Sequence, residues 1–151
     1  MPKASVKRLI ECKKDQLIDL VLDIEKYPDF VPFCLDSHVH KKNKEGSQTL
    51  IIADLTIGKG PFKDTYKSDV KFHKLSNTIN VTNIGGPLNH LENNWMFNEA
   101  KGGTEISFDI DFEIENKFLN VLMSKSFEFG LNKIADAFQK RAEELYRPID
   151  N

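Results

Sequence analysis

The stretch from residue 103 to residue 115 alternates strictly between apolar and polar side chains. Its apolar positions are Ile106, Phe108, Ile110, Phe112 and Ile114, and its acidic positions include Asp109, Asp111, Glu113 and Glu115. Successive side chains of a β-strand point to opposite faces, so the pattern predicts a strand with one face in the core and an acidic face in solvent. Such a strand needs neighbouring strands and an apolar layer over its core face.

The same period of two continues upstream, and segments containing Gly or Asn, several of them with Pro, interrupt it at short intervals. It predicts antiparallel strands over residues 37–45, 47–58, 62–74, 78–84, 90–99 and 103–115. The first dozen residues also alternate and predict one further strand. The short connections favour a meander, so we expect a seven-stranded antiparallel sheet.

Two segments have helical periodicity instead. Residues 15–24 form an amphipathic pattern that the Tyr27-Pro28 step ends, and a short helix or turn is expected over residues 27–33. A terminal helix is expected from an N-cap at Asn116 to Tyr146, with a break near 124–126 or at Gly130 because roughly 30 residues would span about 45 Å. Its apolar stripe is Phe127, Leu131, Ile134, Phe138, Ala142 and Leu145. The prediction is an α+β fold in which a curved sheet surrounds the terminal helix and leaves an apolar cavity between them.

Length and charge narrow the function classes. The chain has 151 residues, which suits a single domain over residues 1–151. Its 21 basic and 23 acidic residues give a net charge of -2, which disfavours a DNA-binding module. We expect a cytoplasmic protein with at most peripheral contact with the inner face of a membrane, because the charged N-terminus does not resemble a secretory leader and no apolar run approaches the roughly 20 residues of a membrane span.

Reactive side chains are few. His38 and His40 share one face of a strand, but no histidine or cysteine spacing typical of a metal site occurs, and Cys34 is interpreted as a small buried residue. We therefore predict no catalytic residue, no metal and no cofactor. Lysines at two places could form a basic patch able to contact RNA: Lys41, Lys42 and Lys44, and Lys63, Lys67 and Lys71.

Four ordered motifs resemble one known family. They are Y-P-D-F-V-P-F-C at residues 27–34, G-P-L-N-H-L-E-N-N-W-M-F at 86–97, D-F-E-I-E-N-K-F-L at 111–119 and A-F-Q-K-R-A at 137–142. Together they are similar to the coenzyme Q-binding protein and ribosome association toxin family, within the START superfamily of polyketide cyclase-like proteins. Leu88 stands where that family usually has Phe, and Asn93-Asn94 replaces a common Gly-Gly. The resemblance implies the helix-grip fold, with two short helices after the first strand.

The resemblance implies that the chain binds ubiquinone or a related polyprenyl lipid, as a lipid chaperone that supports respiration. A ribosome-binding toxin that blocks subunit association through the large subunit is the alternative, and an aromatic or polyketide cyclase is a third. The alternation of side chains along the strands and the helical periodicity of the terminal segment predict which residues line the cavity. That lining is Tyr27, Phe30, Val31, Pro32, Phe33, Leu55, Ile57, Phe62, Tyr66, Leu88, Leu91, Trp95, Phe97, Phe108, Ile110, Phe112, Phe127, Leu131, Ile134 and Phe138.

Two parts of this lining have expected roles. Tyr66, Ser68 and Trp95 are candidate hydrogen-bond donors to quinone carbonyls. Residues 27–33 are expected to form an entrance lid whose exposed Phe30, Val31 and Phe33 dip into a membrane interface. The chain has 11 phenylalanines, and eight of them fall in this lining.

Overall fold

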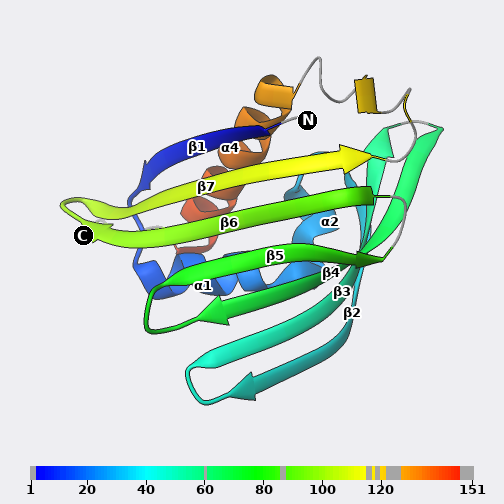
Figure 1. Cartoon of the computed structure of the whole chain (residues 1–151). Coiled ribbons are helices and arrows are strands. Elements are labelled where there is room, and N and C mark those ends of the chain that lie inside the picture. The colour runs from blue at the N-terminus through cyan, green and yellow to red at the C-terminus, as the bar shows by residue number, and fades with distance from the viewer. Residues whose placement is uncertain are drawn as a thin grey trace.

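The computed structural model describes residues 3–59, 61–85, 88–114, 117, 120–121 and 127–146. Within them, seven strands form one antiparallel sheet, and helices cover one face of it (Figure 1). The strands are β1 (Lys3–Ile10), β2 (Cys34–Glu45), β3 (Gln48–Lys59), β4 (Phe62–His73), β5 (Thr78–Gly85), β6 (Leu88–Ala100) and β7 (Gly103–Ile114). The helices are α1 (Lys14–Leu22), η1 (Ile24–Lys26), α2 (Tyr27–Phe30) and α4 (Phe127–Tyr146).

The strand order is β1-β7-β6-β5-β4-β3-β2, so β2 to β7 form the predicted meander and β1 adds beside β7. In this pairing Val6 lies opposite Phe108 and Ala4 opposite Ile110, which joins the apolar faces of the two strands. The prediction of seven strands is confirmed, and their ends differ from the predicted ones by a few residues. The acidic positions Asp109, Asp111 and Glu113 lie on the other face of β7, as predicted, while Glu115 is outside the described residues.

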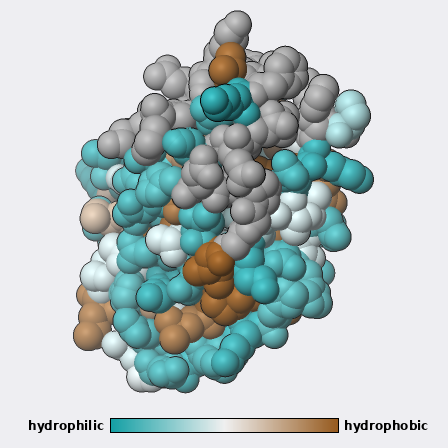
Figure 2. Space-filling view, turned by 45° about the vertical axis from the view of Figure 1, so that its right-hand side comes forward, coloured by the Kyte–Doolittle hydropathy of each residue, from teal (hydrophilic) through white to brown (hydrophobic). Residues whose placement is uncertain are grey.

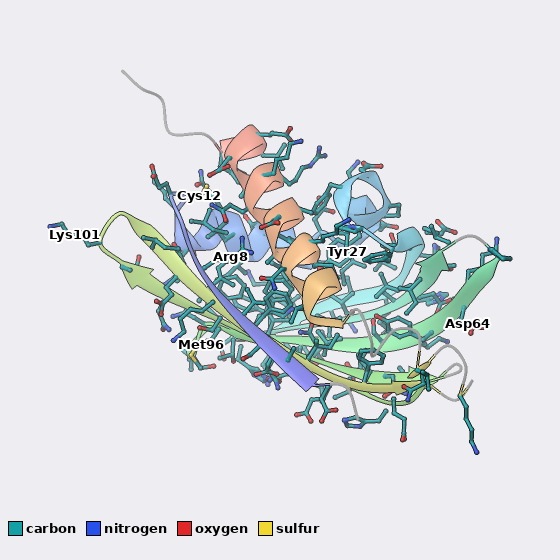
Figure 3. All side chains as sticks on the ribbon, turned by 90° about the horizontal axis from the view of Figure 1, so that it is seen from above. Arg8, Cys12, Tyr27, Asp64, Met96 and Lys101 are labelled. Carbon is teal, nitrogen blue, oxygen red and sulfur yellow. The ribbon has the colours of Figure 1, made fainter. Side chains whose placement is uncertain are left out.

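Helix α4 lies across the concave face of the sheet, and α1 and α2 lie beside it on the same side (Figures 1 and 3). Arg8 of β1 fixes the helix to the sheet edge: its guanidinium donates to Oδ1 of Asp136 at 2.7 Å and to Oε1 of Gln139 at 3.3 Å. Figure 3 shows Arg8 beside α4 and Met96 on the opposite, convex side of the sheet. The concave face is therefore the inner face.

The buried face of α4 is formed by Leu131, Ala135, Phe138 and Ala142. The prediction that Leu145 continues this face is wrong, since its side chain is 51% exposed. Tyr146 packs against the core instead. The four-residue step from Ala142 to Tyr146 turns the helix by about 400°, which is about 40° past a full turn, whereas the three-residue step to Leu145 stops about 60° short of one. Tyr146 therefore lies closer than Leu145 to the buried face of the helix.

The N-terminal part of the expected long helix is only partly described. The expected cap at Asn116 and the expected break at residues 124–126 lie outside the described residues. At Gly130, the other expected position of a break, α4 runs without interruption. A Cβ built on Gly130 would lie 3.6 Å from the ring of Phe33, so this glycine contacts the loop that follows α2.

Candidate functional site

Aromatic rings fill one part of the space between the sheet and α4. Trp95 of β6 stacks on Phe108 with ring centroids 4.4 Å apart, and Phe138 of α4 meets Trp95 edge-on at 5.3 Å. Tyr27 meets Phe138 from the other side at 5.5 Å. These rings pack at the distances of ordinary aromatic contacts. The prediction places Trp95, Phe108 and Phe138 in a ligand lining, but here they form packed core.

The next row of inner-face side chains is less well covered. Val81, Asn93 and Ile110 are register partners on β5, β6 and β7, and all three are half-buried. In the adjacent row, their neighbours Ile79, Trp95 and Phe108 are at most 6% exposed. Inner-face residues of central strands keep accessible surface only where nothing packs against them. This row therefore borders a space that the protein does not fill.

A small apolar cluster continues this row toward the start of β6. Leu91 and Phe112 are 5% and 6% exposed and form a cluster separate from the main core, and Tyr66, Val81 and Ile110 pack around it. Tyr66 lies opposite Leu55 of β3, which is 7% exposed. We call Tyr66, Val81, Leu91, Asn93, Ile110 and Phe112 the inner-face site.

Asn93 is the polar member of this site on β6. Its Oδ1 accepts a hydrogen bond from Nε1 of Trp95 at 2.8 Å, and its Nδ2 donates to the Asp109 carbonyl at 2.6 Å. The indole N–H expected to serve a quinone is therefore already bonded within the protein. Sequence reasoning missed Asn93 as a site residue, although its odd number places it on the same strand face as Leu91, Trp95 and Phe97.

The other two predicted donors differ in their bonding. Ser68 is fully buried, and its hydroxyl donates to the Ala53 carbonyl at 3.2 Å. Tyr66 is half-buried, and among the described residues its hydroxyl has no hydrogen-bond partner. Burial raises the pKa of the Tyr66 phenol above its ordinary range, so it stays protonated and able to donate at neutral pH.

The apolar side chains of residues 27–33 are half-buried beside α4, and only Asp29 of this segment is exposed. Phe30 meets Phe138 edge-on at 5.1 Å, and the guanidinium of Arg141 lies 5.4 Å above its ring. Phe30, Val31 and Phe33 are half-buried, so the prediction of exposed side chains is wrong. The physical reason is that α4 offers these residues an apolar partner, which removes their surface from water.

The loop after α2 is fixed by its backbone. Phe33 has a positive φ of 68°, and its carbonyl accepts from the Gly58 N–H at 2.9 Å. The hydroxyl of Tyr27 donates to the Val21 carbonyl, which connects α2 to α1. The candidate lid is therefore closed and connected to α1, β3 and α4.

The remaining predicted lining residues have varied positions. Pro32, Ile57 and Ile134 are half-buried, while Phe97 and Leu131 are buried in the core. The side chains of Phe62, Leu88 and Phe127 lie outside the described part of the chain. Among the described residues, an open groove of about 340 Å³ lies between β1 and α4, lined by Ala4, Ser5, Val6, Leu131 and Asn132. It adjoins the inner-face site, because Ala4 is the register partner of Ile110.

Groups that could support catalysis or metal binding lie elsewhere. His38 and His40 share the convex face with ring centroids 4.6 Å apart, and Nε2 of His40 lies 2.7 Å from Oδ2 of Asp54. In the described part of the chain, no cluster of His, Cys, Asp or Glu is suited to a metal ion. Cys34 is 7% exposed, as predicted for a small buried residue.

The basic patch is divided between the two faces of the sheet. Residue 40 is a bulge between Val39 and Lys41, after which Lys41 lies opposite Ile52 and Lys42 opposite Ile51. Lys41 therefore shares the convex face with Lys67 and Lys71, whereas Lys42 and Lys44 lie on the other face. The prediction of one patch is wrong because strand alternation separates Lys41 from Lys42 and Lys44. The bulge reverses the parity of the residues that follow it, so Lys41 and not the other two reaches the convex face.

Exposed apolar side chains occur where β2 begins and β5 ends: Leu35 is 48% and Ile84 52% exposed. Figure 2 shows a small hydrophobic area on a face that is otherwise largely hydrophilic. Among the described helices, none combines the length and apolar composition needed to cross a lipid bilayer.

Comparison with known proteins agrees with this geometry. The family model for polyketide cyclase / dehydrase and lipid transport matches residues 10–139. The ribosome association toxin RatA of Rickettsia prowazekii is 30% identical over 143 residues, covering 93% of this chain and 95% of that protein. The mitochondrial coenzyme Q-binding protein COQ10 of Dictyostelium discoideum is 30% identical over 135 residues, covering 87% of this chain but 64% of that protein.

The fold is also that of a solved structure. A START superfamily protein from Mycobacterium smegmatis superposes with a TM-score of 0.76 at 18% identity, over 95% of this chain and 98% of that one. The predicted helix-grip architecture is thus confirmed. The chain belongs to the polyketide cyclase / dehydrase and lipid transport family, and within it to the group that includes ribosome association toxins and coenzyme Q-binding proteins.

Proposed function

We propose that this protein binds a hydrophobic ligand, ubiquinone or a related polyprenyl lipid, at the inner-face site and does not transform it. The observation that carries the proposal is the half-buried row of Val81, Asn93 and Ile110 in the middle of the inner face. Apolar surface left uncovered inside a fold is favourable for an apolar ligand to occupy. The name of the Dictyostelium relative, a coenzyme Q-binding protein, supports this ligand class.

The site offers contacts for binding and few groups for catalysis. Its members are apolar except for Asn93 and Tyr66, and the carboxylates and histidines of β6 and β7 lie on the convex face, except Glu99, which is exposed near the far end of β6. A general acid or base must reach the reacting group within hydrogen-bond distance. Groups on the far side of the sheet do not meet that requirement, which favours a carrier over a cyclase.

Lipid extraction tests the proposal directly. Protein purified from quinone-containing cells is extracted with organic solvent, and the extract is analysed by mass spectrometry. We expect ubiquinone or another polyprenyl lipid to be enriched over an unrelated protein of similar size. Extracts with no enriched lipid would contradict the proposal.

Matched variants locate the bound lipid. Ile110→Phe adds volume at the inner-face site and should reduce the amount of copurified lipid severalfold. Met96→Phe places the same side chain on the convex face, where Met96 is 46% exposed, and should leave the amount unchanged. Equal loss in both variants, with both folded by circular dichroism, would place the lipid elsewhere.

We further propose that residues 27–33 form the entrance and must leave α4 for a ligand to pass. Phe30→Asp places a charge against Phe138 and should open the segment but remove its apolar contact with a membrane. Transfer of decylubiquinone between vesicles should then stop. Normal transfer by a folded Phe30→Asp protein would refute this role.

Ribosome binding is a second candidate function, favoured by the similarity to the ribosome association toxin of Rickettsia prowazekii. Lys41, Lys67 and Lys71 are exposed on one face and could contact RNA phosphates. Overexpression should then increase free ribosomal subunits at the expense of 70S particles in sucrose gradients. Unchanged profiles would argue against this function.

A further inference from the structure

Asn93 interrupts an otherwise apolar stretch of the inner face. Its register partners are Val81 on β5 and Ile110 on β7, and Leu91 and Trp95 flank it on β6. Placing an amide among such neighbours costs free energy unless its polar atoms are bonded. Its Oδ1 and Nδ2 each make one hydrogen bond within the protein, to Trp95 and to the Asp109 carbonyl.

The orientation of this amide follows from its partners. The indole Nε1 of Trp95 can only donate, so the atom facing it at 2.8 Å must be Oδ1. The Asp109 carbonyl can only accept, so the atom facing it at 2.6 Å must be Nδ2. The two contacts agree on one orientation and hold the amide from both sides. The group is therefore preorganised, which lowers the entropy lost when it binds a further group.

The fixed amide retains capacity for one more bond of each kind. Nδ2 carries two hydrogens and Oδ1 two lone pairs, and the bonds to Asp109 and Trp95 use one of each. Among the described residues no second partner of Asn93 is present. Because the side chain is half-buried, a ligand in the space beside it can reach the remaining N–H.

The charge of the lining restricts what that ligand can be. None of the six inner-face site residues is ionised at neutral pH, since burial keeps Tyr66 protonated. A carboxylate or phosphate head group would lose its hydration here with no cation among these residues to replace it. A neutral carbonyl oxygen needs only a donor, and the second N–H of Asn93, which has no partner among the described residues, provides one.

We infer that Asn93 anchors the polar end of the ligand through its free amide N–H, and that this end is a neutral carbonyl group. The inference rests on the proposed function and gives it a chemical selectivity: carbonyl-bearing lipids such as quinones are preferred over hydrocarbons and over fatty acid anions. It also distinguishes this chain from the Gly-Gly pattern usual at these two positions, which offers no side-chain amide.

Isothermal titration with three probes tests the selectivity. The probes are decylubiquinone, decylbenzene, which has the same tail and no carbonyl, and palmitate, which is anionic. The unmodified protein should bind decylubiquinone about tenfold more tightly than either of the others, the typical effect of one hydrogen bond to a buried group. Equal affinity for decylubiquinone and either other probe would overturn the inference.

The chain supplies a matched pair of variants. Asn93→Leu keeps the size of the side chain and removes its donor, so its affinity for decylubiquinone should fall about tenfold, to the level of decylbenzene. Asn94→Leu makes the same change one residue on, where the side chain faces outward and donates to Asp109, and should bind like the unmodified protein. If Asn93→Leu does not fold, Asn93→Ala, which adds no volume, should show the same loss.

The outcomes separate this inference from the proposed function. A variant at Asn93 that is folded and keeps the preference for decylubiquinone would refute the anchor and leave lipid binding standing. An unmodified protein that binds none of the three probes would refute lipid binding itself. Because the chain has one tryptophan, quenching of Trp95 emission by decylubiquinone gives an independent check that the quinone ring lies beside Asn93.

Discussion

Phe138 connects the lid, the terminal helix and the sheet, and its truncation is the sharpest test of this arrangement. Its side chain is 5% exposed and meets Tyr27, Phe30 and Trp95 edge-on at 5.5, 5.1 and 5.3 Å. Removing a buried phenylalanine side chain costs about 3–5 kcal/mol. Phe138→Ala should therefore lower the free energy of unfolding by about 4 kcal/mol.

A second substitution separates ring contacts from buried volume. Phe138→Leu keeps most of the apolar volume and loses three ring pairs, each contributing about 0.5–1.5 kcal/mol. We expect a loss of about 2 kcal/mol. Leu145→Ala on the same helix, where the side chain is 51% exposed, is the control and should change stability by less than about 0.5 kcal/mol.

Guanidinium unfolding at 25 °C, followed by circular dichroism and by Trp95 fluorescence, measures these changes. The midpoint should decrease and the slope should stay constant if only stability changes. Hydrogen exchange of the Val31 N–H, which bonds the Tyr27 carbonyl at 2.8 Å, should accelerate as α2 loosens. A loss below about 1 kcal/mol for Phe138→Ala would refute the packing of α2 and α4 described here.

Three further predictions concern two glycines and a buried thiol. Gly130→Ala should stabilise the protein by about 0.5–1 kcal/mol in thermal unfolding, because the new Cβ meets the Phe33 ring at an ordinary 3.6 Å and alanine favours a helix. Gly103→Ala should instead prevent stable folding, because φ is +149° and the Cβ would lie 2.1 Å from the Ile10 carbonyl oxygen; a normally stable Gly103→Ala protein would contradict this strand geometry. Burial raises the pKa of the Cys34 thiol from 9.0 to about 11, so the fold favours the protonated form. Its contribution to stability is complete below pH 9 and lost as pH rises to about 11, by at most about 3 kcal/mol. The difference in denaturant stability between the unmodified protein and Cys34→Ala should shrink over that pH range, and a constant difference would refute the shift.

The basic surface shows where sequence reasoning failed and why. Strand alternation assigns faces correctly only while the pairing register is regular, and the bulge at residue 40 cannot be read from Val39-His40-Lys41. The prediction that residues 27–33 form an exposed lid failed for a different reason. Phe30 and Phe33 lie within two residues of a proline, which indicates a loop, but their exposure depends on α4, more than 90 residues later in the chain.

Residue alternation was sufficient to predict the strands and the inner face of the sheet. The alternation of Ile106, Phe108, Ile110 and Phe112 assigns these residues to one side of β7 in any register that buries them, because the side-chain period of a strand is two. The motifs at residues 27–34 and 86–97 were enough to indicate the family.

Which inner-face residues are packed and which border open space depends on contacts between elements far apart in the chain. Trp95 and Asn93 are two residues apart on the same face, yet rings from α4 and β7 cover Trp95, while Asn93 stays half-buried. Parity gives the direction of a side chain, but its burial depends on what approaches from elsewhere in the chain, and that follows from the packing of whole elements.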